Sequence, residues 1–318
     1  MPYLGGIPVL DETEPGQPIL TGYEDSRTLA FRSVDGADLI SFTGDEYIAR
    51  WGMTGLEVPP RELVEDETQG EDGSQLDEIK TLGRTWSIPL RVGSNSSHRD
   101  FLLKRGAVRQ LLNYRGVDYK AHGGTFDLVA NSVLGERALR AAYASGWEGD
   151  RQQATSGPYF ETVPLVGRSV RPYWTSARWS TPPIVRPTGI PFFGSWPPAG
   201  LSPSRTLGAD IPVTVDGDAS PWVKIEAGGY APYLEISGPG LYVLIPDGLA
   251  AGETLRFDTY PASRFPLFNG QLDWNRVATP RSYAPVPPGD NIFNLDLGAA
   301  GATAWAAVSG PTLWETPW

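Results

Sequence analysis

The chain has 318 residues, enough for two ordinary domains that each bury a core. It has no cysteine, which excludes disulfides, thiolate metal sites and a cysteine nucleophile. Its formal charge of -11 opposes binding to nucleic acid, which depends on Lys and Arg, and we expect no sequence-specific binding either. The 37 Gly and 30 Pro follow no Gly-X-Y period, which excludes collagen. Together with 11 Trp, 13 Tyr and 11 Phe, they indicate a folded, mainly β chain with many tight turns.

The first residues and the apolar runs predict no targeting to or insertion into a membrane. Met1 to Gly6 lacks the basic region and apolar run of a signal peptide. No apolar stretch approaches the roughly 18 residues that span a bilayer. We therefore expect synthesis in a cytoplasm, without signal-peptide export.

Two β segments are predicted early in the chain. Thr28 to Phe42 alternates apolar and polar residues on both sides of Asp35-Gly36, which predicts a hairpin. Trp86 to Val92 alternates in the same way and predicts a second strand. Its central Pro89 cannot donate to a ladder, so we expect a sheet edge or a bulge there.

The acidic segment from Glu57 to Lys80 lies between these two β segments. It has nine acids and only two bases, which would repel one another in a compact fold. Pro59-Pro60, Gly70 and Gly73 also favour an extended, long loop. A solvated loop and an acidic lining are both open readings of this segment.

One short helix is predicted from Arg99 to Asn113, with Ser97 or Asp100 able to cap its start. A strand is expected at Thr125 to Val129. The pattern from Gly135 to Tyr143 fits a helix face as well as a strand.

The second half of the chain differs in composition, and we place a domain boundary between residues 170 and 171. It holds 21 of the 30 prolines and eight of the 11 Trp. The proline-rich stretch from Ser180 to Pro203 is expected to be extended along a surface. Beyond it, short alternating strands end at Gly or Pro every 8 to 12 residues, which predicts a β-sandwich.

No residue pattern predicts an enzyme, a metal site or a cofactor site. His98 and His122 stand outside every zinc-ligand spacing, and we expect neither to have a catalytic role. Nucleophile-elbow, P-loop and Rossmann motifs are absent. The sequence Asp216-Gly217-Asp218 fits a turn better than a calcium loop. A glycosidase needs only two suitably spaced carboxylates, so this class stays open. Exposed Trp could also stack on sugars, with Trp196 and Trp274 as the candidate glycan contacts.

Four stretches between about 70 and 314 form a recognisable order. They are Gly70 to Leu76 with the strand Trp86 to Val92; the helix Arg99 to Asn113; Glu136 to Leu139, Tyr143 to Gly149, Val163 to Val166 and Pro172-Tyr173-Trp174; and Val213 to Asp218, Pro221, Ile236 to Gly240 and Pro288 to Asn291. In these stretches and their order the chain resembles the distal tail protein of siphophages, a phage tail family protein. The first 60 residues show only generic strands, and Asp216 stands where the family pattern has Asn.

The resemblance implies a structural protein of the virion tail tip or baseplate, made in the host cytoplasm. Residues 1–170 would form a β domain that closes a homohexameric ring under the tail tube. Residues 171–318 would form an outward β-sandwich, galectin-like or similar to a carbohydrate-binding module. The partners would be other copies, the tail tube protein and the tail hub, with a central channel for DNA and a host-attachment role that includes a possible host glycan. The resemblance also makes Gly135 to Tyr143 a strand.

Within such a ring, the acidic segment has a predicted role. We expect Glu65, Asp66, Glu67, Glu71 and Asp72 to face the channel or a partner. The alternative function is a carbohydrate-binding or lectin-like module, which would be monomeric and would bind glycans through exposed Trp.

Overall fold

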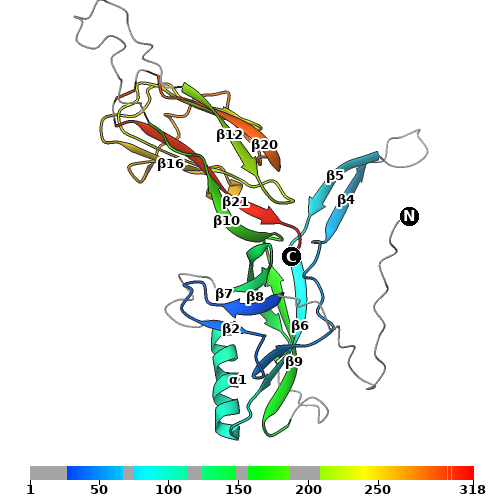
Figure 1. Ribbon diagram of the computed structural model, residues 1–318. Helices are drawn as coiled ribbons and strands as arrows, with labels where there is room; N and C mark the ends of the chain where they lie inside the picture. The colour runs from blue at the N-terminus through cyan, green and yellow to red at the C-terminus, as the bar shows by residue number, and fades with distance from the viewer. Residues whose placement is uncertain are drawn as a thin grey trace, which may run out of the picture.

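The computed structural model describes residues 27–66, 75–112, 124–147, 157–185, 208–298, 300–301 and 303–318 (Figure 1). As predicted, this part of the chain is mainly β, with one α-helix. Two hydrophobic cores lie in two bodies joined at a narrow junction, from which a two-stranded hairpin projects (Figure 1).

The first body is a curled antiparallel sheet in the order β2-β1-β7-β8-β9-β6-β3, with α1 against β6 and β7. Its elements are β1 (Thr28–Arg32), β2 (Leu39–Ser41), β3 (Tyr47–Ala49), β6 (Arg84–Gly93), α1 (His98–Leu112), β7 (Thr125–Ser132), β8 (Gly135–Ser145) and β9 (Phe160–Ser169). Inward aromatic side chains fill it: the ring of Phe31 lies 5.1 Å from Phe126 and 6.1 Å from Trp86. Burial of such rings is the main source of stability of a sheet with one covered face.

The predicted hairpin, strand and helix of the first body are all present. β1 pairs with β2 across the predicted turn. The helix begins where the sequence predicts, because the Asp100 amide donates to Ser97 Oγ at 3.1 Å and satisfies one open donor of the first turn. Residues 135–145 form strand β8, which confirms the strand that the family resemblance implies.

The edge or bulge predicted at Pro89 is only a local interruption of pairing. β6 pairs with β9 along its whole length, with Pro89 opposite Pro164 and no bulge. On the other side, Pro89 O accepts from the Arg50 amide at 2.8 Å, one residue beyond the end of β3. Pro89, which has no backbone N–H to donate, therefore lies at the position where pairing between β6 and β3 ends. β6 is not a free edge of the sheet.

The second body is a sandwich of two antiparallel sheets around the second core. One sheet contains β10 (Trp174–Ser180), β21 (Trp305–Trp314), β13 (Lys224–Gly228), β16 (Thr254–Asp258), β17 (Pro266–Phe268) and β18 (Gln271–Leu272), with β11 (Ile184–Val185) beside β21. The other contains β12 (Gly208–Val215), β20 (Gly289–Asp296), β14 (Leu234–Gly238), β15 (Leu241–Ile245) and β19 (Ser282–Tyr283). The single-turn η1 (Pro261–Ser263) follows β16. The alternation read from the sequence places its apolar residues between the sheets, as expected for a sandwich.

The acidic segment is a β-hairpin, so the prediction of a long loop is wrong for its described part. β4 (Arg61–Asp66) and β5 (Gln75–Thr81) pair with each other and with no third strand among the described residues. Apolar residues placed between the acids allow cross-strand pairs, and Glu62 stands opposite Lys80. These pairs offset the charge repulsion on which the loop prediction depended. We call this hairpin the arm.

Candidate assembly surfaces

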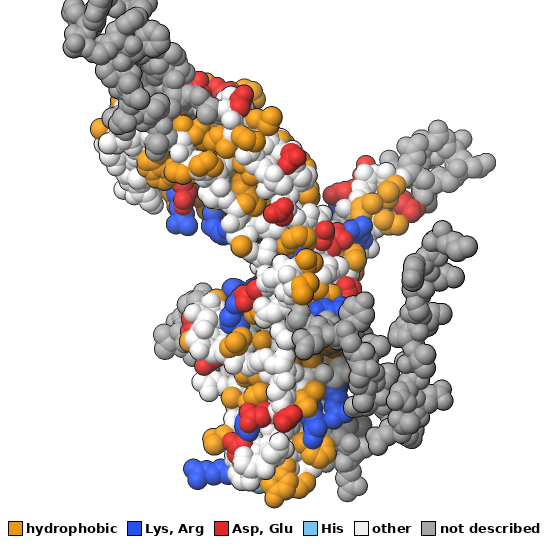
Figure 2. Space-filling view, in the orientation of Figure 1, with side chains coloured by type: hydrophobic (Ala, Val, Ile, Leu, Met, Phe, Trp, Pro, Cys, Tyr) orange, Lys and Arg blue, Asp and Glu red, His pale blue; other side chains and the backbone are white. Residues whose placement is uncertain are grey.

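The arm exposes an apolar face. Leu63 stands opposite Ile79, and a bulge after Val64 brings Glu65 opposite Leu76. Leu63 and Glu65 are two residues apart on one strand, so their partners share the same face. Leu63, Leu76 and Ile79 are 58%, 55% and 50% exposed. Figure 2 shows hydrophobic and acidic side chains side by side on the projecting arm.

The base of the arm is held by a buried arginine, Arg84. Its Nη1 donates to Leu56 O at 2.7 Å and to Glu57 O at 2.6 Å, and its Nη2 donates to Glu315 O at 2.9 Å. Burial of the guanidinium lowers the pKa of Arg84 to about 10, although the nearby Glu315 and Glu57 carboxylates oppose this shift. Arg61, at the start of β4, also pairs with Glu315 at 2.5 Å. The arm is thereby tied to the C-terminal end of the chain.

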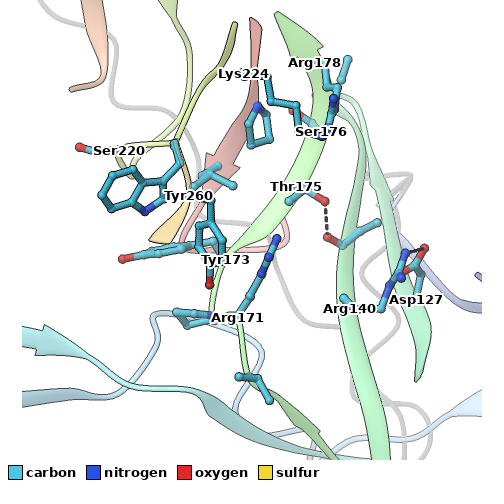
Figure 3. Close-up of a pocket in the computed structure, with 18 of the residues that line it drawn as sticks. Asp127, Arg140, Arg171, Tyr173, Thr175, Ser176, Arg178, Ser220, Lys224 and Tyr260 are labelled. Atoms are coloured by element: carbon cyan, nitrogen blue, oxygen red, sulfur yellow. Dashed lines mark hydrogen bonds and ion pairs between the residues drawn. The ribbon is translucent and has the colours of Figure 1, made fainter. Parts of the chain in front are cut away.

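A second surface is the groove between the two bodies, which we call the junction groove (Figure 3). It has a volume of about 1150 Å³. β8 and β10 both line it and share only one residue pair, Ala138 with Thr175, before they diverge. Thr175 Oγ1 reinforces this pair by donating to Ala138 O at 3.0 Å. The diverging strands leave main-chain groups at the groove without a neighbouring strand in the described part of the chain.

The junction groove is positively charged, although the protein as a whole is acidic. Its lining includes five cationic and three acidic side chains: Arg32, Arg140, Arg171, Arg178 and Lys224, with Asp127, Glu136 and Asp258. Each acid already has a cation: Arg32 lies 2.6 Å from Glu136, Arg140 lies 2.5 Å from Asp127, and Lys224 lies 3.8 Å from Asp258. The groove therefore has an excess of two positive charges.

Three aromatic residues, Tyr173, Trp222 and Tyr260, line the groove together with small polar and aliphatic residues. Two arginines of the lining, Arg171 and Arg178, form no ion pair within the described ranges. The Arg171 guanidinium lies 4.2 Å from the centre of the Tyr260 ring, and Tyr260 meets Trp222 edge-on at 6.3 Å. Arg178 is exposed at the groove. Figure 3 shows Arg171, Tyr173 and Tyr260 close together.

The predicted site residues do not come together at one place. Glu65 lies on the arm, and Asp66 ends β4, whereas Glu67, Glu71, Asp72 and Trp196 lie outside the described residues. Trp274 packs on the second core: its ring meets Phe257 edge-on at 5.9 Å, and the Arg281 guanidinium lies 4.7 Å from its centre. The roles proposed for these residues stay predictions.

Nothing in the described part of the chain forms a metal site or a membrane-spanning helix. No three His, Asp or Glu side chains gather there in a way that could hold an ion. None of the helices described has the length and apolar character to cross a membrane. His98 is exposed, and its Nδ1 lies 2.5 Å from Pro158 O, while His122 is outside the described ranges. Gly217, with a φ of 107°, forms an isolated bridge with Leu313, and Asp216-Gly217-Asp218 is a bend between strands of different sheets instead of a hairpin turn.

Comparison with known proteins identifies the fold. No family model and no curated protein matches the sequence. Solved structures of phage proteins match the chain in fold. The SPP1 Dit (gp 19.1) protein, described as a paradigm of the hub adsorption apparatus in phages that infect Gram-positive bacteria, is 14% identical with a TM-score of 0.57. The match covers 90% of this chain and 98% of that one, which confirms the predicted resemblance at the level of the fold.

Two structures of the phage P2 baseplate in its activated conformation also match, one with Ca and one with Sr. They are 8% and 9% identical, with TM-scores of 0.48 and 0.47. Each match covers 89% of this chain and 97% of the other.

Proposed function

We propose that this chain is a structural subunit of a phage tail tip, which forms a homohexameric ring between the tail tube and the tail hub. The ring would surround a channel through which DNA passes. The observation that carries this proposal is the fold match to the SPP1 Dit protein, because it extends over both bodies and nearly the full length of both chains. The fold match supports a place in the tail tip.

The arm supports assembly independently of that match. A two-stranded hairpin is only marginally stable in water, and strands with open edges tend to pair with other chains. Here three half-exposed aliphatic side chains also lie on one face of the hairpin. Contact with another copy would cover this apolar face and would explain why it is exposed in the single subunit.

Carbohydrate binding by the second body is the alternative. Trp274 is the described candidate, but Phe257 and Arg281 already pack against its ring. The part of the ring available to a sugar is thereby reduced. The contacts of Trp274 therefore favour a structural role for it.

The proposal is tested by native mass spectrometry of the purified protein, together with antibody labelling of purified virions. We expect a six-copy particle and a label at the distal end of the tail tube. A protein that is absent from virions, or present as a single copy per tail, would overturn the proposal. A monomer that binds glycan at micromolar concentration and loses this binding on Trp274→Ala would support the alternative.

A further inference from the structure

The junction groove holds cationic groups that no carboxylate of the described residues neutralises. Each of its three acids already pairs with a cation, whereas Arg171 and Arg178 have no such partner in that part of the chain. Arg171 lies over the Tyr260 ring, and a guanidinium that stacks on a ring can still donate its in-plane N–H groups to an anion. In a protein with a formal charge of -11, two such arginines in one groove indicate an acidic occupant.

The groove also has an open strand edge on β10. One side of β10 pairs with β21, whereas on the other side β8 pairs only with Thr175. The main-chain groups of residues 176–180 on that other side have no strand partner within the described ranges. An extended peptide adds to such an edge through main-chain hydrogen bonds, which a sugar cannot reproduce. The edge therefore favours a polypeptide as the occupant.

Residues 1–26, which precede the described part of the chain, have a sequence that matches these two features. They contain five acids and no Lys, Arg or His. Three of the acids lie in residues 9–14, a stretch between two prolines in which every residue has a main-chain donor. The second proline restricts the residue before it to an extended conformation. As an added strand, this stretch would place Leu10, Glu12 and Glu14 on one face.

The segment is also long enough to reach the groove of its own copy. Arg27 lies over the ring of Trp318, and Figure 1 shows this C-terminus at the junction of the two bodies. β1, which follows Arg27, is three strands away from β10 in the sheet, or about 15 Å. Arg178 lies a further three residues, or about 10 Å, along β10 from Thr175. Glu14 precedes Arg27 by 13 residues, which span about 40 Å when extended.

We propose that residues 9–14 add as a strand along β10 in the junction groove of their own copy. Glu12 and Glu14 pair there with the two arginines that have no acidic partner in the described ranges, and they neutralise the groove's excess of two positive charges. The added strand contacts β8 of the first body and β10 of the second, so it fastens the two bodies together. Because the contact lies within one copy, it does not depend on the proposed ring.

Site-specific photo-cross-linking of the full chain tests the contact directly. A benzoylphenylalanine at Leu10, on the docking face, is activated in the purified protein, and the linked peptides are mapped by mass spectrometry. Mixing copies labelled with ¹⁴N and ¹⁵N shows whether a link joins one chain or two. We expect links within one chain that map to 171–180, 220–224 or 258–263. The same probe at Thr13, on the opposite face of the added strand, should lose these links.

Charge reversal provides the second measurement. Glu12→Lys with Glu14→Lys should lower the yield of the Leu10 links at least about fivefold, because like charges would then meet in the groove. Arg171→Glu with Arg178→Glu should lower it as much, and all four substitutions together should restore it. Circular dichroism checks that each variant folds, which is expected because both arginines are exposed.

A matched control separates pairing in the groove from a general effect of net charge. Glu24→Lys with Asp25→Lys changes the net charge of residues 1–26 by the same amount but lies outside the docked stretch. It should leave the yield of the Leu10 links unchanged.

The outcomes separate this inference from the proposed function. Leu10 links that map outside the groove, or that join two chains, would overturn the docking within one copy. Links that persist after both charge reversals, or that the four substitutions together fail to restore, would overturn the pairing of Glu12 and Glu14 with the arginines. None of these results depends on the number of copies, which native mass spectrometry measures separately.

Discussion

Arg84→Met should loosen the arm and destabilise the first body. The native guanidinium is fully buried and donates to three main-chain carbonyls, from Leu56, Glu57 and Glu315. Methionine has a similar reach but no donor, so all three bonds are lost. Leu56 O keeps one donor, the Trp174 indole nitrogen at 3.1 Å, whereas the other two carbonyls depend on water.

The size of the loss follows from two opposing terms. Hydrogen bonds to a charged group contribute about 1.5 to 3 kcal/mol each, so three are worth about 4.5 to 9 kcal/mol. The buried charge has a cost, because desolvation lowers the pKa of Arg84 from 12.5 to about 10, which corresponds to about 3 kcal/mol. Methionine recovers this cost, and we expect a net loss of about 1.5 to 6 kcal/mol in the free energy of unfolding.

The assay is urea denaturation combined with hydrogen exchange of the arm. Exchange at 56–66 should accelerate more than exchange in β7, because the lost bonds hold the base of the arm. The folded pKa lies below the unfolded one, so the cost of the charge is complete below pH 10 and is relieved only at higher pH. The difference from the native protein should therefore be constant from pH 5 to 9.

A matched control distinguishes this anchoring from a general effect of arginine loss in β6. Arg91, in the same strand, is partly exposed and lies over the Phe160 ring at 5.0 Å. Arg91→Met should cost about 1 kcal/mol or less. The reasoning is wrong if Arg84→Met matches the control in stability and leaves exchange in the arm unchanged.

Three further substitutions test the first body. Gly167→Ala should lower the melting temperature clearly, since a Cβ there would lie 2.1 Å from Cζ2 of the buried Trp86; an unchanged value would refute this packing. Hydrogen bonds from Lys104, Ser94 and Ser96 lower the pKa of Asp100 to about 2. The stability that the ionised Asp100 contributes is therefore present above pH 4 and is lost toward pH 2. Asp100→Asn should therefore flatten the acid limb of a melting-temperature profile, and an identical limb would contradict it. His98→Ala should leave ring assembly and infectivity intact, because the imidazole is exposed and contacts only the Pro158 carbonyl and the edge of the first core at Phe101 among the described residues; loss of infectivity in a folded variant would reveal a missed site.

The sequence predicts the sandwich and the first sheet well, because period-two alternation reports directly which face of a strand is buried. Leu241, Val243 and Ile245 alternate in the sequence and are all buried. The helix is also predictable, since Ser97 acts locally through its cap. The boundary at 170/171 stays a prediction, and Trp174 shows its limit: this residue follows the boundary but packs with the first core.

The arm shows where sequence reasoning fails. Counting charges between Glu57 and Lys80 led to a loop, although Leu63 and Val64 lie between acids as they would in a strand. The bulge after Val64 also shifts the alternation of β5, so that Leu76 and Ile79 share a face three residues apart. Only the pairing register reveals that shared face, because a simple alternation would place these two residues on opposite sides.

The junction groove was not predictable, because its lining comes from Arg32 to Leu313. The C-terminal end of the chain joins the two bodies beside the groove. Trp314 and Trp318 pack against the first core, although β21 belongs to the second body. Arg137 of β8 stacks on Trp314 at 3.8 Å and donates to Thr316 O at 3.0 Å.

These contacts connect the arm and β8 to the same C-terminal segment. Arg84 and Arg61 hold the base of the arm to Glu315, and Arg137 holds β8 of the groove to the neighbouring residue, Thr316. The short segment from Trp314 to Trp318 therefore ties the base of the arm to β8. A ring of identical copies closes only when every copy has the same shape. The buried arginines Arg84 and Arg137, the second of which stacks on Trp314, restrain that shape at the junction.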